Sequence, residues 1–377
     1  MSEYKSLVNK IPIPPEGKTK QKDYLKMGAL AIVDQGQELI GGYTDNTEKT
    51  IRCELPVVVF GDHTRAVKYI TFPFGAGADG IKVLQPKETV LPKFLYYGTQ
   101  YLAAKMPSRG YARHYQFLEK MDLPVPPLAE QQHIVARIEE LFSQLDSSVE
   151  TLRKTKQQLA VYRQAVLKEA FEGRGICVRK IKDACIKEFA EVGTGATPLT
   201  TNKAYYGGNI PWITSGKISD GDIYNPTEYI TELAINETNC KIYPAHTLLV
   251  AMYGEGKTRG KCAELMIPAA TNQALAAIVL DENAIVKKSF LKWFLAFNYE
   301  NIRLKAVGGV QPNINLNIVK NIAVPIFSKH DQIRIVEEIE SRLSVCDSIE
   351  QTVDAALQQA EALRQSILKQ AFEKESI

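Results

Sequence analysis

Two short loops place cationic side chains next to glycine, directly after an apolar run. The first loop, GDHTRAVK, follows LPVVVF (55–60), and the second, GEGKTRGK, follows TLLVAMY (247–253). Glycine lets a backbone approach a ligand closely, and Lys, Arg and Thr are side chains that bind phosphate groups. The pattern indicates a phosphate-binding surface, and it also suits an ordinary solvated turn. The candidate residues are His63, Thr64, Arg65, Lys68, Lys257, Thr258, Arg259 and Lys261.

Three other motifs resemble cofactor sites but are incomplete. GEGKT (254–258) resembles the end of a P-loop, yet Ala251 stands where a phosphate-binding loop needs glycine. FGAGADG (74–80) has irregular glycine spacing and precedes a strand-like run, not a helix. NPTEY (225–229) has Thr227 where the corresponding methyltransferase motif has proline. We therefore predict no catalytic residues and no cofactor on this chain.

Cysteine and histidine usage gives no sign of a metal site. The six cysteines form no CxxC pair, and the five histidines do not complete a zinc-ligand spacing. We interpret the cysteines as reduced thiols. No apolar stretch is long enough to span a membrane, and the N-terminus lacks a signal-peptide core. These features predict a soluble, cytoplasmic protein that does not bind a membrane.

An internal repeat organises the chain. Shifted by 201 residues, Pro124–Glu172 aligns without a gap on Pro325–Glu373, and nineteen positions are identical. The agreement is closest where RQAVLKEAFE (163–172) aligns with RQSILKQAFE (364–373). Chance does not produce such a match over fifty residues, so both copies should fold alike.

Each copy of the repeat predicts one long helix. Neither 128–172 nor 329–373 contains proline or glycine, so nothing interrupts a helix there. Apolar residues recur at steps of three and four, with charged residues between them, as in a coiled coil. We expect the two helices to pair with each other. The predicted seam residues are Ile134, Ile138, Leu141, Leu145, Leu152, Leu159 and Val166 in the first copy, and Ile335, Ile339, Leu343, Cys346, Ile349, Val353, Leu357, Leu363 and Ile367 in the second.

The segments outside the repeat have a different character. They are rich in Gly, Pro, Tyr, Thr and Asn, with short β-like runs, and each should contain one amphipathic helix, near 93–105 and 286–305. The predicted fold class is α+β: two mixed α/β domains separated by two long antiparallel helices that form a coiled coil, with a pseudo-twofold internal repeat. The predicted domains are 1–127, 128–173, 174–327 and 328–377.

The helical repeat and parts of the second globule resemble a known family. LPVPPLAEQQHIVARIEELFSQLD (123–146) is similar to the conserved helical region of specificity subunits of type I restriction–modification enzymes. The second copy keeps the Pro, Gln, IV and IE, but Asp331 replaces Glu130. VGTGATPLTTNKAYYGGNIPWITSGKIS (192–219) resembles the start of a target recognition domain, and GVQPNIN (309–315) also fits. The first globule is shorter and lacks a clear counterpart of VGTGATP.

The resemblance implies what each part would do. Each globule would be a target recognition domain that reads one half of a bipartite double-stranded DNA sequence. The two helices would set the spacing of the halves and dock two modification subunits, with restriction subunits as further partners. S-adenosylmethionine and ATP would be bound by those partner subunits.

A DNA-reading role extends the set of candidate residues. Arg and Lys recognise guanine, Asn and Gln recognise adenine, and cations contact phosphates. The net charge of the whole chain is only +3, so a DNA-binding surface must come from local clusters. Besides the two loops, the candidates are Lys203, Tyr205, Lys217, Gln311 and Asn313 in the second globule, and Lys18, Lys20, Lys22, Arg109, Arg113 and His114 in the first.

Two other classes of protein remain as alternatives. A catalytic DNA methyltransferase with a fused recognition region would need the glycine loop and proline motif that are broken here. A coiled-coil scaffold that binds only protein would not need two large globules with basic loops.

Overall fold

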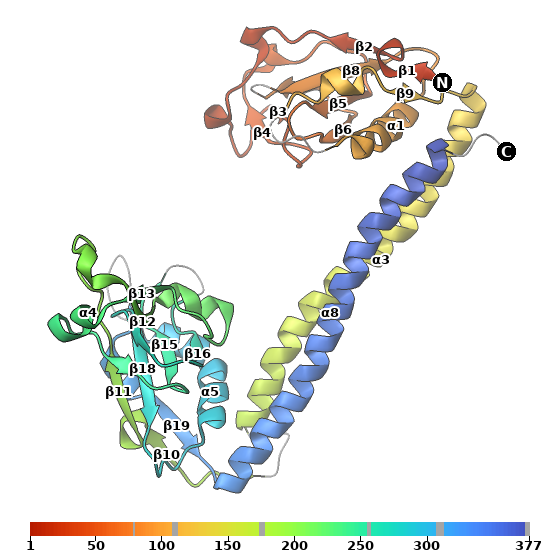
Figure 1. Ribbon diagram of the computed structural model, residues 1–377. Coiled ribbons are helices and arrows are strands. Elements are labelled where there is room, and N and C mark those ends of the chain that lie inside the picture. The colour runs from red at the N-terminus through yellow and green to blue at the C-terminus, as the bar shows by residue number, and fades with distance from the viewer. Residues whose placement is uncertain (78–79, 108–111, 173–177, 255–257, 307–312, 374–377) are drawn as a thin grey trace. The chain divides into compact units, whose positions relative to one another are not determined.

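The computed structural model of the chain describes residues 1–77, 80–107, 112–172, 178–254, 258–306 and 313–373. Tertiary contacts divide the chain into two units (Figure 1). Unit 1 comprises Met1–Thr155 and Thr352–Ile377, and unit 2 comprises Lys156–Gln351. Each unit therefore contains one globule and a part of each long helix.

Both long helices form over the predicted residues. Helix α3 spans Leu128–Glu172, and α8 spans Lys329–Glu373. Ser328 caps α8, because its hydroxyl accepts the backbone N–H of Asp331 at 3.0 Å. Gly173 follows directly after α3 in the sequence.

Unit 1 begins with a globule of short strands and one substantial helix. The main sheet has the strand order β2-β8-β5-β6, with β2 and β6 at its edges, and a second sheet has the order β4-β3-β7. The described elements are β1 (Ser2–Glu3), β2 (Val8–Ile11), β3 (Leu30–Val33), β4 (Gly42–Thr44), β5 (Val57–Gly61), β6 (Val67–Ile70), β7 (Phe74–Ala76), β8 (Ile81–Pro86), α1 (Pro92–Lys105), α2 (Tyr115–Leu118) and β9 (Asp122–Leu123).

Unit 2 repeats this topology with additions. Its sheets have the orders β11-β18-β15-β16 and β13-β12-β17-β14. Strand β14 and helix α4 have no counterpart among the described elements of unit 1. The described elements are β10 (Lys182–Cys185), β11 (Ala190–Thr194), β12 (Tyr206–Ile213), β13 (Glu228–Ile230), α4 (Glu232–Glu237), β14 (Ile242–Tyr243), β15 (Leu248–Ala251), β16 (Cys262–Glu264), β17 (Ala269–Thr271), β18 (Leu275–Leu280), α5 (Lys288–Phe297), α6 (Tyr299–Leu304), α7 (Leu316–Lys320) and β19 (Ala323–Ile326).

The pairing of strands shows that the repeat extends beyond the long helices. In unit 1 the middle strand β5 pairs antiparallel with β6 and β8, and in unit 2 β15 pairs antiparallel with β16 and β18. Strands β3 and β7 are parallel, as are β12 and β17. The internal repeat predicted from the helices is thus a repeat of the whole fold. One expectation needs correction: the helix predicted near 286–305 is two helices, α5 and α6, which meet at Asn298.

Each globule packs against both long helices through an apolar core. In unit 1 the core joins Phe60 on β5 and Phe94 on α1 to Ile138 on α3 and Phe372 on α8. The core of unit 2 joins β15 and α5 to the end of α3 and the start of α8 in the same way. The aromatic side chain near the end of each repeat copy is equivalent: Phe372 packs on α1, and Phe171 packs on α5.

A buried glutamine holds each globule helix to its long helix. The side-chain oxygen of Gln131 accepts the N–H of Leu91 at 2.8 Å, and its amide donates to the carbonyls of Thr89 and Pro126. Gln332 does the same with Lys287 at 2.7 Å and with two other backbone carbonyls. Both glutamines are fully buried. All their hydrogen-bonding partners are backbone groups, so each buried side-chain amide has partners for both its oxygen and its nitrogen.

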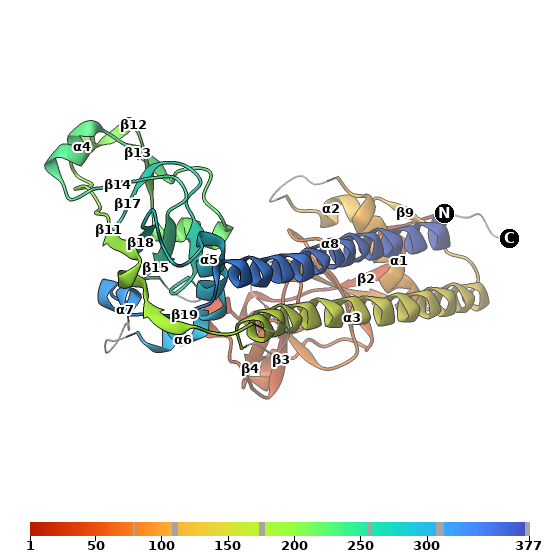
Figure 2. The ribbon, with the colours of Figure 1, turned by 90° about the horizontal axis from the view of Figure 1, so that it is seen from below.

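Within each unit the two helical segments lie side by side and run in opposite directions (Figure 2). In unit 1 Arg364 on α8 pairs with Asp146 on α3. In unit 2 Arg163 on α3 pairs with Asp347 on α8 at 2.6 Å, and this pair is the repeat equivalent of the first. The predicted antiparallel coiled coil is confirmed.

Most predicted seam residues are buried or half-buried, but two are not. Leu363 is 51% exposed and Ile349 is 40% exposed. In each case the following residue takes part in pairing: Arg364 lies over the ring of Phe142, and Glu350 pairs with Arg163. The seam prediction is therefore wrong at Leu363 and Ile349, because polar side chains take their places between the helices.

Candidate nucleic-acid interface

The two basic loops lie at corresponding places in the two units. The first connects β5 to β6, and the second connects β15 to β16. Behind the first loop, the carbonyl of Asp62 accepts the backbone N–H of His114 at 2.8 Å. Behind the second, the carbonyl of Met252 accepts the backbone N–H of Ile314 at 3.1 Å. Each loop is thus joined to the segment that precedes α2 or α7.

In unit 1 a cleft of about 720 Å³ opens beside this loop. It gathers three residues predicted from the sequence, Lys18, His63 and Arg113. It also gathers Lys10 on β2 and Lys82 on β8, which the sequence prediction missed. The sequence signal for these two was weak, because a lysine within a strand normally marks a solvent-exposed face.

The cleft is strongly positive. Asp62 is the one acidic side chain among its described lining residues. This carboxylate is 3% exposed, accepts the N–H of Tyr115 at 2.8 Å and lies 3.3 Å from the ammonium group of Lys82. The ammonium group of Lys10 lies over the ring of Tyr115, 5.6 Å from its centroid. Among the described lining residues, Lys10 and Arg113 are therefore cations beyond the one that pairs with Asp62.

Two predicted contacts in unit 1 are wrong. Lys68 is 4% exposed, and its ammonium group donates to the carbonyl of Asp34 at 2.8 Å. Burial lowers the pKa of Lys68, and the neighbouring Asp34 opposes this effect. His114 is 2% exposed, with Nδ1 against the carbonyl of Asp62 at 3.0 Å. Neither side chain reaches the surface, so neither can contact DNA in this structure.

The remaining predicted residues of unit 1 are partly or fully accessible. Arg65 donates to the carbonyl of Met106 at 2.7 Å, which orients it along the protein surface. Thr64 donates to the carbonyl of Gln35. Lys20 and Lys22 are exposed, and their role stays a prediction. Arg109 lies outside the described residues.

In unit 2 the structure brings some of the predicted residues together. The hydroxyl groups of Ser219 and Thr258 lie 3.3 Å apart, which places the short 3-10 helix η7 (Ser215–Asp220), with Lys217, beside the β15–β16 loop. Arg259 and Lys261 are half-buried in that loop. These contacts assemble one candidate surface from two segments.

Other predicted residues of unit 2 lie on different elements. Lys203 and Tyr205 belong to the 3-10 helix η6 (Lys203–Tyr205), which contacts α4, and Tyr205 donates to Glu237 at 3.0 Å. Asn313 is half-buried, directly before Ile314. Lys257 and Gln311 lie outside the described residues.

A close backbone approach explains one glycine of the VGTGATP segment. A Cβ atom on Gly195 would overlap with the carbonyl oxygen of Thr271 on β17. Only glycine lets β11 lead into the following loop at this distance from the second sheet. In unit 1 the corresponding join is a hydrogen bond from the N–H of Thr19 to the carbonyl of Ala76 at 3.0 Å.

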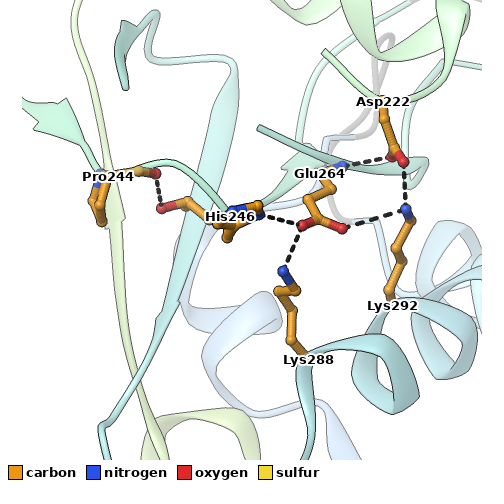
Figure 3. A network of polar contacts seen from close by, with 7 residues as sticks. Asp222, Pro244, His246, Glu264, Lys288 and Lys292 are labelled. Carbon is orange, nitrogen blue, oxygen red and sulfur yellow. Dashed lines mark hydrogen bonds and ion pairs between the residues drawn. The ribbon is translucent and has the colours of Figure 1, made fainter. Parts of the chain in front are cut away.

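A charged network on unit 2 holds α5 against the sheet (Figure 3). The carboxylate of Glu264 on β16 lies 2.6 Å from the ammonium group of Lys288 and 3.5 Å from that of Lys292. His246 contributes Nδ1 at 2.8 Å, and Asp222 lies 2.6 Å from Lys292. Both lysines are thus committed to carboxylates of their own unit.

The network also sets the protonation of its central carboxyl group. Burial alone would raise the pKa of Glu264, but hydrogen bonds from Lys288 and His246 outweigh it and hold the pKa below its ordinary value. Burial would lower the pKa of Lys292, but Asp222 and Glu264 hold it above its ordinary value. The pair therefore stays charged, as a structural clamp does.

The described part of the chain contains no group of three or more His, Cys, Asp or Glu side chains that could hold a metal ion. None of its helices combines the length and the apolar character that crossing a membrane requires.

The duplicated domain and the paired helices are features that this chain shares with a known protein family. The family model described as the type I restriction modification DNA specificity domain matches residues 16–160 and 179–359. The chain therefore belongs to the type I restriction–modification DNA specificity family.

Particular relatives agree with this assignment. The chain is 24% identical over 358 residues to the specificity subunit of the type I restriction enzyme EcoR124I/EcoR124II of Escherichia coli, covering 91% of this chain and 86% of the relative. It is 27% identical over 278 residues to the EcoBI specificity subunit of Escherichia coli, covering 67% of this chain and 58% of the relative.

Solved structures share the fold. One is a chain from a study of complex assembly and conformational transition in a type I R-M system, with a TM-score of 0.69 and 16% identity, over 98% of this chain and 96% of that one. Another is the HsdS subunit from Thermoanaerobacter tengcongensis, with a TM-score of 0.53 and 16% identity, over 100% of this chain and 96% of that one. The predicted fold class is confirmed.

Proposed function

We propose that this chain reads a bipartite sequence in double-stranded DNA, with unit 1 contacting one half and unit 2 the other. The observation that carries the proposal is the duplicated fold, which presents the loop after its middle strand twice, at the same place in each globule. Two copies of one reading surface suit a target with two separate parts. Cationic and amide side chains near both loops supply contacts to phosphates and base edges.

We further propose that this chain catalyses nothing and that S-adenosylmethionine and ATP bind to its partner subunits. The residues that resemble a methyltransferase motif serve the fold instead. Thr227 of NPTEY accepts the backbone N–H of Thr214 at 3.0 Å, and the motif leads into β13. The glycine loop begins with Phe74–Ala76, which is the strand β7.

The proposed partners on the helical arms are two modification subunits, with restriction subunits completing the assembly. Apolar side chains that the coiled coil leaves exposed support a docking role. On the helical segments of unit 2 these are Val161 and Val345, which are 71% and 58% exposed. On unit 1 Leu363 is exposed in the same way. Because the substrate is genomic DNA, we place the protein in the cytoplasm.

Exchange of one globule tests the bipartite reading. Residues 174–327 are replaced by the matching segment of a relative, the hybrid is produced with its modification subunits, and modified sites are mapped across the genome. One half of the target should change, while the other half and the spacer stay the same. The matched control replaces residues 1–127 and should change the opposite half. A hybrid that alters both halves would contradict the assignment of one half to each unit.

A further inference from the structure

Three cations that line the cleft of unit 1, Lys10, Lys82 and Arg113, have uncharged residues at the corresponding positions of unit 2. Strand registers identify the corresponding positions. Lys82 on β8 pairs with Phe60 on β5, and Ala276 on β18 pairs with Val250 on β15. Phe60 and Val250 both face the globule helix of their unit, so these two pairs are equivalent. The position of Lys82 is therefore occupied by alanine in unit 2.

The same comparison holds on the next strand. Lys10 on β2 pairs with Leu84, and Val192 on β11 pairs with Ile278. Leu84 and Ile278 follow Lys82 and Ala276 by two residues, which places Lys10 and Val192 at one position. Here too a cation in unit 1 corresponds to an apolar side chain in unit 2.

Backbone hydrogen bonds align the remaining wall of the cleft. Arg113 precedes the residue whose N–H donates to Asp62, and Asn313 precedes the residue whose N–H donates to Met252. Asp62 and Met252 thus correspond, and so do the residues that follow them in the sequence, His63 in unit 1 and Tyr253 in unit 2. The unit 2 surface therefore presents an amide and a phenol where unit 1 presents a guanidinium and an imidazole.

We propose that the unit 1 cleft binds the sugar–phosphate backbone of duplex DNA and that Lys10 and Arg113 carry a salt-dependent part of the affinity, for which the corresponding positions of unit 2 hold no cation. This inference rests on the proposed function. A cleft in which cations outnumber acidic side chains attracts an anionic ligand. Each phosphate neutralised by a cation releases counterions, so it steepens the fall of affinity with salt. Uncharged contacts through Tyr253 and Asn313 do not.

The choice of residues for a test follows from their partners. Lys82 is left in place because it neutralises Asp62, a nearly buried carboxylate. Lys10 and Arg113 have no ion pair among the described residues, and Arg113 is exposed. A Lys10→Gln/Arg113→Gln double variant thus removes two positive charges without leaving a buried carboxylate unpaired.

A matched control removes two charges from the same unit, away from the cleft. Lys5 lies in the turn before β2, and Lys87 follows the last residue of β8. The cleft is at the opposite end of β8, where Gly80 and Ile81 line it. The control is Lys5→Gln/Lys87→Gln. For unit 2 the corresponding variant is Tyr253→Ala/Asn313→Ala.

The experiment measures duplex affinity of the full chain with its modification subunits between 50 and 200 mM salt. Each lost phosphate contact should lower the slope of log affinity against log salt by about 0.9. The Lys10/Arg113 variant should therefore show a slope lower by about two, which is roughly a tenfold smaller loss of affinity over this range. Sequence preference should stay unchanged. The Lys5/Lys87 control and the Tyr253/Asn313 variant should keep the parent slope, the latter with weaker or altered recognition of one half-site.

The outcomes separate this inference from the proposed function. Because the slope compares affinities of one sample, a partly misfolded preparation does not imitate a change in it. A parent slope in the Lys10/Arg113 variant overturns the inference, and so does an equal fall of slope in the Tyr253/Asn313 variant. If the parent complex shows no sequence preference for any duplex, the proposed function itself fails.

Discussion

The contact between the globule helix and the main sheet is built differently in the two units. Gln131 and Gln332 bind the first turns of α1 and α5 at Leu91 and Lys287, so Tyr96 and Lys292 are equivalent, five residues further on. Facing them on the sheet are Tyr69, paired with Val58, and Glu264, paired with Leu248. Unit 1 thus has two tyrosine rings with centroids 5.5 Å apart, where unit 2 has an ion pair.

The apolar positions around this contact do not differ in the same way. Phe94 and Leu95 on α1 correspond to Phe290 and Leu291 on α5, and all four are fully buried. The shared fold is therefore specified by buried apolar side chains and by the glutamine that holds the helix. The half-exposed position beside them accepts either an aromatic pair or an ion pair. Only the ion pair, in unit 2, makes the stability of its unit depend on the charge of the side chains.

Removal of the aromatic side chain at the end of each repeat copy should have the largest effect, and it should be equal in both units. Phe372→Ala removes a ring that contacts Phe94 and Tyr101. Phe171→Ala removes a ring that contacts Phe290 and Phe297. Each should lower the free energy of unfolding by about 3–5 kcal/mol. Denaturant unfolding, with amide hydrogen exchange to assign the loss to a unit, measures this.

The exposed Val161 on α3 provides the control for these two variants, because Val161→Ala removes a side chain that is 71% exposed. Its free energy of unfolding should stay within about 0.5 kcal/mol of the parent. If either phenylalanine variant were as stable as this control, the two ends of the repeat would not be equivalent.

A smaller effect, confined to unit 2, is expected at Gly195. Gly195→Ala forces a Cβ atom against the carbonyl of Thr271, so either β11 or β17 must shift. We expect a loss of about 1–3 kcal/mol in the free energy of unfolding, with faster hydrogen exchange in β17 and no change in unit 1. Gly216→Ala is the control, since its Cβ would meet no atom within 4 Å. Equal stability of the two variants would refute the close approach.

Lowering the pH should have the smallest effect on stability, and this effect should be confined to unit 2. The pKa of Glu264 is held below its ordinary value of 4.5, so the network stabilises unit 2 fully above that pH and loses this stabilisation as pH falls through the lower folded value. The groups that face it are Asp222, His246, Lys288 and Lys292. In unit 1 burial raises the pKa of Tyr69 and Tyr96 instead, so this contact does not titrate in acid.

Thermal unfolding is measured at pH values between 6 and 3, and amide hydrogen exchange assigns the loss of stability to a unit. Unit 2 of the parent should lose more stability than unit 2 of Glu264→Gln, which starts lower but has no carboxylate to protonate. Tyr69→Phe in unit 1 is the matched control and should not alter the acid response. An identical acid response in the parent and Glu264→Gln would show that the network does not control it.

Regular features of the fold could be predicted because each depends on a strong local signal. The absence of proline and glycine from 128–172 and 329–373 predicted two long uninterrupted helices, which are α3 and α8, and the apolar run 275–280 is the strand β18. The break at Asn298 could not be predicted, because the apolar pattern continues across it. A pattern of periodicity also cannot show that Arg364 displaces Leu363 from the seam, since that depends on Asp146 in the other helix.

The candidate site was harder to predict than the fold. Strand alternation distinguishes two faces, but it does not reveal that a second sheet covers the face of Lys68. For the same reason strand alternation did not predict the role of Lys10 and Lys82, which line one cleft only because β2 and β8 pair. The loop after the middle strand was found in both units because glycine and cations adjoin an apolar run. Folding alone decides which of those cations remain accessible.

The division of the long helices between the units has a consequence for the order in which the protein is completed during synthesis. Unit 2 is one continuous segment, Lys156–Gln351, whereas unit 1 needs Thr352–Ile377, which is made after unit 2. At about 5–20 residues per second, the intervening 200 or so residues take roughly 10–40 s. Through that interval Phe94 and Tyr101 wait for Phe372 to cover them. Unit 1, whose globule precedes unit 2 in the chain, is therefore completed only after unit 2 has been made.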